Sequence, residues 1–108
     1  MKNIFITGVS GYFGSKLVLL FDQKDEVGSI VGIDMKPPSY TSKKLEFIKH
    51  DVRNDMSPIL LIRGIDCAIH TAYILPPIHN KTLMEDINIK GTKNFLDSCA
   101  KAGVSQLL

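Results

Sequence analysis

Three glycines join the first apolar run of the chain to its first helical pattern. The stretch TGVSGYFG (7–14) places them at positions 8, 11 and 14, directly after the run NIFIT (3–7). Apolar residues at helical spacing then continue from residue 12 to about residue 24. A strand, a glycine loop and a helix in this order favour a turn that cradles a pyrophosphate, because glycine permits positive φ and leaves backbone N–H groups accessible. Ordinary turn glycines are the alternative interpretation.

The rest of the chain alternates between short apolar runs and helical patterns. A short helix is expected within 56–62, with Ser57 as its cap and Pro58 in its first turn, and a long helix over 81–101, with Gly103 as its C-cap. The connection between the second and third strands contains Pro37 and Pro38, so a loop without a full helix is expected there. The expected strands are 3–7, 29–34, 45–51, 65–72 and 104–108.

This alternation predicts an α/β fold, a Rossmann-type parallel sheet with flanking helices that is truncated after about the fifth strand. A length of 108 residues corresponds to one domain, and we expect residues 1–108 to form a dinucleotide-binding domain. Gly91 interrupts the long helical pattern. Close packing of that helix on a neighbouring element would explain a glycine there.

Charge and cysteine usage exclude several classes of protein. The net charge is +2 and the 13 Lys and Arg are scattered, which does not indicate a nucleic-acid or membrane-surface partner. The N-terminal apolar run is too short for a signal peptide, and no run approaches the length of a membrane helix. Cys67 and Cys99 stand far apart without a metal-ligand pattern, so we expect buried, reduced thiols in a cytoplasmic protein and no bound metal.

Further landmarks narrow the interpretation of the glycine loop. The form TGxxGxxG resembles the cofactor loop of the short-chain dehydrogenase/reductase superfamily. The stretches GID (32–34), HDVRN (50–54), IHTAY (69–73) and NIKGTKNFLDSCAKAGVSQLL (88–108) resemble landmarks of its extended branch, the NAD-dependent epimerase/dehydratase family of sugar-nucleotide enzymes. The match spans essentially the whole chain. It implies a bound NAD cofactor and, in the full-length protein, a nucleotide-sugar or another small substrate with a hydroxyl or carbonyl group.

The landmarks also converge on one place. Gly8, Asp34, Asp51 and the pair Thr71 and Ala72 each follow a predicted strand, and ligands of open parallel sheets bind outside the carboxyl ends of the strands. A carboxylate at Asp34 can accept hydrogen bonds from both ribose hydroxyls of NAD but repels the 2′-phosphate of NADP. Lys36 partly offsets that repulsion, so NAD is expected and NADP is the less favoured cofactor. The alternative for Asp34 is a turn acid ahead of Pro37.

The resemblance assigns further roles. It implies that Asp51 lies near the adenine amino group and that Val52 supports the ring. It also implies that the stretch after the fourth strand lines the nicotinamide half, where Tyr73 departs from the usual small residue, and that Asn88 orders this region. The alternatives are a solvated acid for Asp51 and an incidental surface residue for Asn88. The predicted cofactor contacts are Gly8, Ser10, Gly11, Tyr12, Phe13, Gly14, Asp34, Met35, Asp51, Val52, Thr71, Ala72, Tyr73 and Asn88.

Three histidines and two Tyr-x-x-x-Lys matches need an interpretation of their own. His70 lies in an apolar run, which favours a core histidine over a catalytic base, and His50 and His79 carry no functional signal. Catalysis in the resembled family uses a Ser or Thr after the fifth strand and a Tyr-x-x-x-Lys on the next helix. The matches Tyr12/Lys16 and Tyr40/Lys44 lie elsewhere in the order of the sheet, so we assign no catalytic residue in this chain.

The resemblance therefore implies that residues 1–108 are the NAD-binding portion of a nucleotide-sugar epimerase, dehydratase or related oxidoreductase, an incomplete domain without its catalytic and substrate-binding portion. Two alternatives from other classes remain. One is a non-catalytic NAD(P)-binding sensor. The other is an interaction module, in which the fifth strand offers an unprotected edge and the long helix 81–101 holds a homodimer.

Overall fold

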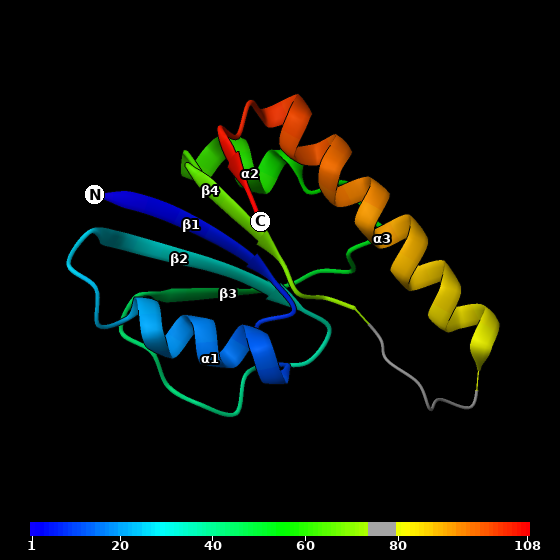
Figure 1. The fold of residues 1–108 in the computed structure, drawn as a ribbon, viewed down its shortest axis with the longest axis horizontal. Helices are drawn as coiled ribbons and strands as arrows, with labels where there is room; N and C mark the ends of the chain where they lie inside the picture. Colours follow the sequence, from blue (N-terminus) through cyan, green and yellow to red (C-terminus); the bar gives the residue numbers. More distant parts are fainter. Residues whose placement is uncertain (74–79) are drawn as a thin grey trace.

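The computed structural model describes residues 1–73 and 80–108, and its centre is a five-stranded sheet with helices on both faces (Figure 1). All neighbouring strands are parallel and follow the order β3-β2-β1-β4-β5. This confirms the predicted Rossmann-type sheet. His79 lies outside the described residues. The strands are β1 (Lys2–Thr7), β2 (Val27–Asp34), β3 (Leu45–Lys49), β4 (Cys67–His70) and β5 (Gln106–Leu107).

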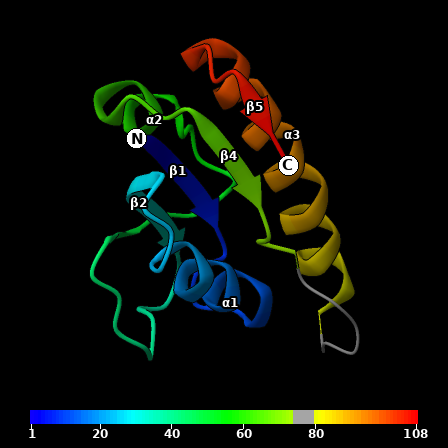
Figure 2. The same cartoon turned by 60° about the vertical axis from the view of Figure 1, so that its left-hand side comes forward.

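The helices bury the two faces of the sheet in separate clusters. Helix α1 (Tyr12–Phe21) packs through Val18 on one face, whereas α2 (Ser57–Arg63) and α3 (Lys81–Ala102) cover the other (Figures 1 and 2). Residues of β1 alternate between the two clusters, with Phe5 facing α2 and α3 and its neighbours facing α1. A strand covered on both faces needs the continuous apolar character that the sequence shows.

Most helix and strand boundaries differ from the predicted ones by a few residues, and one assignment was wrong. Ser57 does not cap α2. It is the first residue of the helix, after Met56 at the N-cap, and its hydroxyl donates to Asp55. Pro58 does lie in the first turn, as predicted. Strand β4 begins at Cys67, later than expected, because α2 ends at the left-handed Gly64 and the Ile65 N–H still donates to the Leu60 carbonyl of that helix.

Helix α1 shows why helical spacing alone does not identify a buried face. Val18 is fully buried and Gly14 lies inside, and Leu17 and Phe21 are partly buried against the same cluster. Phe13, which shares the apolar spacing, is 65% exposed at the start of the helix. The buried face of α1 is thus centred on Gly14 and Val18, one helical turn apart, and Phe13 lies outside it.

The strand register brings four strand ends to one edge of the sheet. Thr7, the last residue of β1, pairs with Ile33 of β2 and with His70 of β4, and Asp34 pairs with Lys49 of β3. The connection from β2 to β3 contains no helix, as the prolines predicted. Strand β1 is the point at which the order of the sheet reverses, and a crevice forms at the carboxyl ends of its neighbours.

Helix α3 runs across the sheet and beyond its carboxyl edge (Figure 1). It ends at Gly103, which adopts a left-handed conformation, so the predicted C-cap is confirmed. A Cβ on Gly91 would lie 2.7 Å from a methyl of Val52, so the glycine brings α3 close to the loop after β3. Within the described residues, no helix is both long enough and apolar enough to cross a bilayer.

Candidate functional site

A cleft of about 450 Å³ lies at the carboxyl edge of the sheet. Its walls come from the loops after β1, β2, β3 and β4 and from the first half of α3. These segments are far apart in the chain, and the parallel sheet brings them together. The residues that line the cleft are Gly8, Gly11, Asp34, Met35, Lys36, His50, Asp51, Val52, Arg53, Thr71, Ala72, Tyr73, Leu83 and Ile87.

The glycine loop is shaped by two close backbone approaches. Gly8 has a φ of +76°, and its N–H donates to the carbonyl of Ile33 at 2.9 Å. A Cβ on Gly8 would lie 2.8 Å from the nitrogen of Ala72. A Cβ on Gly14 would lie 2.1 Å from the carbonyl oxygen of Gly8, which no backbone adjustment of a few tenths of an ångström could relieve. The loop is therefore packed against α1 on one side and against the β4 loop on the other.

The N-terminus of α1 carries no side-chain cap. Gly11 occupies the N-cap position, where it has no side chain to accept from the first-turn N–H groups. Such groups, together with the positive end of the helix dipole, form a favourable environment for an anion. Tyr12 and Phe13 are exposed and pack edge to face at 5.4 Å between ring centroids, and neither lines the cleft.

Asp34 links the glycine loop to the end of β2. Its Oδ2 accepts from the Ser10 N–H at 3.1 Å, and its Oδ1 accepts from the Met35 N–H at 2.7 Å. The Ser10 hydroxyl also donates to the Lys36 carbonyl at 2.6 Å. Asp34 thus orders a turn, as the alternative interpretation held, and it also lines the cleft. The two roles are compatible because a carboxylate has about four acceptor positions.

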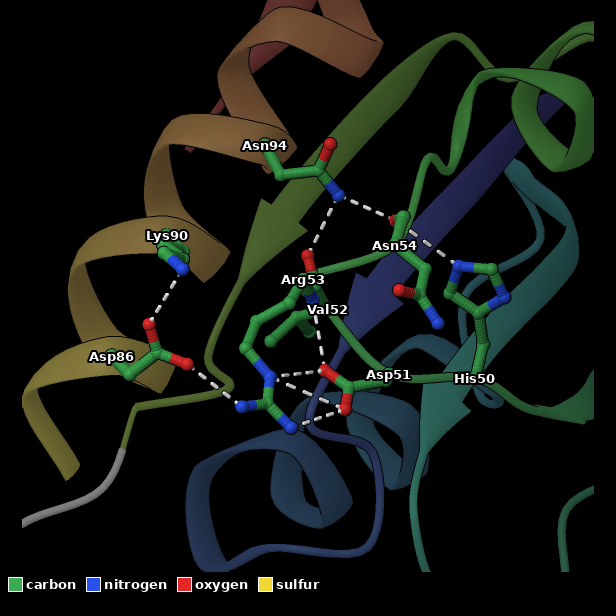
Figure 3. Close-up of polar contacts among 8 residues, drawn as sticks. All are labelled: His50, Asp51, Val52, Arg53, Asn54, Asp86, Lys90 and Asn94. Carbon is green, nitrogen blue, oxygen red and sulfur yellow. Dashed lines mark hydrogen bonds and ion pairs between the residues drawn. The ribbon is translucent and has the colours of Figure 1, made fainter. Parts of the chain in front are cut away.

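Asp51 belongs to a chain of charged groups that joins the β3 loop to α3 (Figure 3). Nη2 of Arg53 lies 2.7 Å from Asp51 Oδ2, and Nη1 of the same guanidinium lies 2.8 Å from Asp86 Oδ2. Lys90 pairs with the other oxygen of Asp86 at 3.1 Å. Hydrogen bonds from Arg53 hold the pKa of Asp51 below its usual range. Asp51 is therefore a paired carboxylate at the wall of the cleft.

Asn94 fixes the backbone of the same loop. Its Nδ2 donates to the carbonyls of Val52, at 2.7 Å, and Asn54 (Figure 3). The His50 Nε2 lies 3.2 Å from the Asn54 carbonyl. Val52 itself is buried beneath Gly91. One side-chain amide of α3 thus holds two carbonyls of the loop after β3.

The loop after β4 is held by β1. The Thr71 hydroxyl donates to the Thr7 carbonyl at 2.6 Å, and the Ala72 N–H donates to the Thr7 hydroxyl at 3.2 Å. His70 is partly buried with both ring nitrogens near threonine hydroxyls, as expected for a core histidine. Burial lowers the pKa of His70.

The cleft brings together most of the predicted contacts, and others lie outside its lining. The predicted residues that line it are Gly8, Gly11, Asp34, Met35, Asp51, Val52, Thr71, Ala72 and Tyr73. Ser10 acts behind the wall through its hydrogen bonds, Gly14 lies beneath the loop, and Asn88 is buried in α3. Tyr12 and Phe13 are exposed at the start of α1.

Five lining residues are absent from the predicted contacts, and of these only Lys36 was considered beside the cofactor. Leu83 and Ile87 are one helical turn apart on α3, and their apolar spacing was visible, but the position of α3 over the cleft was not. Arg53 stands two residues after Asp51, and its lining role depends on the direction of its side chain. His50 had no signal beyond its place at the end of the third strand.

Neither Tyr-x-x-x-Lys match forms a catalytic arrangement. The Tyr40 hydroxyl donates to the Val9 carbonyl at 2.8 Å, and burial raises the Tyr40 pKa. Lys44 donates instead to two backbone carbonyls near the end of α1. The ammonium of Lys16 lies 4.8 Å from the ring centroid of Tyr12, at the protein surface. Throughout residues 1–73 and 80–108, no three His, Cys, Asp or Glu side chains form a group that could hold a metal ion.

The chain is similar in sequence to curated short-chain and hydroxysteroid dehydrogenases. It is 31% identical over 111 residues to short-chain dehydrogenase/reductase family 42E member 1 of Danio rerio, covering 99% of this chain and 28% of that protein. It is 29% identical over 116 residues to a 3-beta-hydroxysteroid dehydrogenase of Mycolicibacterium neoaurum, covering 100% and 31%. The chain therefore spans about three tenths of the length of these relatives.

The chain has the same fold as parts of solved enzyme structures, and its sequence matches the profile of one family. The structure of Bordetella bronchiseptica WbmH in complex with NAD⁺ superposes with a TM-score of 0.85 at 22% identity, covering 99% of this chain and 38% of that one. Residues 5–108 match the sequence profile of the 3-beta hydroxysteroid dehydrogenase/isomerase family. The chain belongs to this family, within the extended short-chain dehydrogenases/reductases that the sequence resemblance had indicated.

Proposed function

We propose that this chain binds NAD in the cleft and is the cofactor-binding portion of an oxidoreductase or isomerase of its family. The observation that carries the proposal is the meeting of the uncapped glycine loop and the Asp34 carboxylate at one edge of the sheet. The loop offers backbone donors for a pyrophosphate, and the carboxylate offers acceptors for sugar hydroxyls. The complex of WbmH with NAD⁺ supports the same choice of ligand by analogy of fold.

The residues of the cleft fit the parts of such a ligand. Because Gly8 and Gly14 have no Cβ, the backbone of the glycine loop packs closely against its neighbours. Lys36, which also lines the cleft, supplies a positive charge. On the β3 side, Asp51 and Val52 would take the adenine. On the β4 side, Thr71, Ala72 and Tyr73 would take the nicotinamide half. The bound cofactor would supply a hydride acceptor, whereas the residues of this chain bind and orient it.

The substrate can be inferred only from the longer relatives, so we propose its chemical class alone. The family description and the M. neoaurum relative favour oxidation of a secondary alcohol of the hydroxysteroid type over the nucleotide-sugar that we expected from the sequence. Hydride transfer from such an alcohol needs a base for the hydroxyl proton. We propose that this base is the Tyr-x-x-x-Lys tyrosine of the family, supplied outside these 108 residues. The cytoplasmic location and the role as a non-catalytic sensor remain predictions.

A titration of the chain with NAD⁺ and NADP⁺ tests the cofactor site. Asp34→Ala removes the acceptors for the ribose and the anchor of Ser10, and we expect it to weaken NAD⁺ binding by about tenfold or more. Asp25→Ala is the matched control, because Asp25 is exposed and does not line the cleft. The wild-type chain should bind NAD⁺ more tightly than NADP⁺. A folded chain that binds neither dinucleotide would overturn the proposal.

We also propose a homodimer through the long helix 81–101. Ile89 and Leu96 lie about two turns apart on α3 and are 68% and 49% exposed, which leaves apolar surface on that helix. Size-exclusion chromatography with light scattering tests this, with Ile89→Glu expected to give a monomer. A wild-type monomer would contradict it.

A further inference from the structure

His70, at the end of β4, is not one of the proposed cofactor contacts, but it bonds to both the sheet and α3. The Nδ1 of His70 lies 2.7 Å from Thr7 Oγ1 on β1, and its Nε2 lies 3.2 Å from Thr92 Oγ1 on α3. The ring stacks on Phe95, with centroids 4.8 Å apart and an interplanar angle of 22°. The imidazole is therefore held between the sheet and α3, directly before the loop that lines the cleft.

The hydrogen bonds of Thr7 determine which nitrogen of His70 carries the proton. The fully buried Thr7 Oγ1 accepts from the Thr71 N–H at 3.1 Å and from the Ala72 N–H at 3.2 Å. A hydroxyl has one proton and two acceptor positions, and both acceptor positions are thereby occupied. The hydroxyl proton must then donate to Nδ1 of His70. The imidazole is consequently the neutral tautomer with its proton on Nε2, from which it donates to Thr92.

Protonation of His70 would leave this cluster with one donor too many. An imidazolium carries N–H donors at both nitrogens, so the Thr7 hydroxyl would face three donors with two acceptor positions. The Thr71 N–H keeps a second acceptor in the Thr7 carbonyl, at 3.2 Å. Among the described residues, the Ala72 N–H has no second acceptor. The Thr7 hydroxyl proton, displaced from His70, would have to turn toward the N–H groups of Thr71 and Ala72 and would have no acceptor there, so the contact of these two residues with Thr7 would be disrupted.

Disruption of this contact would also affect the glycine loop. The backbone of Ala72 lies so close to Gly8 that a Cβ on the glycine would be 2.8 Å from the Ala72 nitrogen. The Thr71 hydroxyl also lies 3.3 Å from the Gly8 carbonyl. The two segments are therefore closely packed, and a displacement of Thr71 and Ala72 would alter the loop that we propose to cradle the pyrophosphate.

We propose that His70 is a positioning residue for dinucleotide binding, whose neutral Nε2–H tautomer keeps Thr71 and Ala72 seated against the glycine loop and whose protonation releases them. This inference rests on the proposed function. Among the described residues, the groups in contact with the imidazole are Thr7 of β1 and Thr92 and Phe95 of α3, and the Leu108 carbonyl beyond β5 accepts from the main-chain N–H of His70. None of these side chains is charged.

The sign of the pH dependence follows from burial. Burial lowers the pKa of His70 below its usual value, so the ring is neutral at neutral pH and gains its proton only on acidification. NAD⁺ affinity should be full above about pH 6.5 and should fall as the pH drops through the lowered pKa.

Calorimetric titrations with NAD⁺ between about pH 8 and about pH 5 test the proposal. The background is the variant His50→Gln/His79→Gln, which removes the other two histidines, including the one that lines the cleft. We expect about tenfold weaker binding at the acid end in this background. Adding His70→Asn should abolish the acid-side loss, because the amide oxygen can accept from Thr7 but does not titrate.

Imidazole nitrogen chemical shifts provide a second readout that does not depend on a ligand or on the folding of the variant. They should report the Nε2–H tautomer in the wild-type chain at about pH 8. Binding that does not change with pH, an equal acid-side loss in the His70→Asn variant, or an Nδ1–H tautomer would each overturn the role of His70 while the proposed function stands. Failure of the wild-type chain to bind NAD⁺ at about pH 8 would overturn both.

Discussion

The cleft has two walls that are held together in different ways. In the β1–β4 wall, Gly8, Thr71 and Ala72 line the cleft, and hydrogen bonds among uncharged groups join them to Thr7 and His70 behind, around a fully buried hydroxyl. In the β3–α3 wall, Asp51 and Arg53 line the cleft, and ion pairs join them to Asp86 and Lys90 through side chains that are about a fifth to seven tenths exposed (Figure 3).

This difference separates the parts of the site that should be rigid from the part that can adapt. Buried hydrogen bonds tolerate no missing partner, because an unsatisfied buried group loses its full solvation. Partly exposed ion pairs are screened by salt and exchange readily with water. We therefore expect the β1–β4 wall to tolerate substitution poorly and the β3–α3 wall to change with solution conditions.

The largest effect should come from Gly14→Ala, behind the β1–β4 wall. The new Cβ would lie 2.1 Å from the Gly8 carbonyl, so α1 and the loop would have to separate. We expect a loss of about 3 kcal/mol in the free energy of unfolding, measured with urea. Gly11→Ala is the matched control: its Cβ would lie 3.4 Å from the same carbonyl, and we expect a loss of about 1 kcal/mol or less. Equal urea midpoints for the two variants would contradict the packing described.

An intermediate effect should come from Thr7→Val, which keeps the volume of the side chain and removes its hydroxyl. The His70 Nδ1 and the Ala72 N–H would lose their partner, and we expect a loss of about 2 kcal/mol in the free energy of unfolding. Thr7→Ser keeps the hydroxyl and removes one methyl, which should lower stability by about 1 kcal/mol. A serine variant less stable than the valine variant would show that packing, and not hydrogen bonding, holds this wall.

The smallest effect should come from the pair Arg53 and Asp86. A double-mutant cycle with Arg53→Gln and Asp86→Asn should give a coupling that disappears in about 1 M salt, whereas the effect of Thr7→Val should not change. Hydrogen bonds from Arg53 and Lys90 lower the pKa of Asp86, so the coupling should be present above about pH 4 and lost as the pH falls further. The exposed pair Lys93 and Asp97 is the control and should show less coupling. A coupling insensitive to salt would remove the contrast between the two walls.

The sequence predicted the fold because its signals were local. Apolar runs, the prolines of the β2–β3 connection and Gly103 at the end of α3 each act within a few residues, and each is found where it was expected. The assignment of Ser57 as a cap failed because Asp55, two residues earlier, accepts from the same turn and moves the start of the helix. Several polar side chains near a helix start compete for the same donors, and spacing does not identify which one prevails.

The sequence by itself determined the alternation of strands and helices and the position of the glycine loop, and so the edge of the sheet at which a cleft forms. Only the tertiary structure decided that α3 contributes Leu83 and Ile87 to that cleft, that Arg53 joins Asp51 to Asp86, and that His70 lies between two threonines. The physical reason is separation along the chain. Thr7 and His70 are 63 residues apart, and side-chain direction and hydrogen-bond partners between such positions are fixed by packing rather than by local pattern.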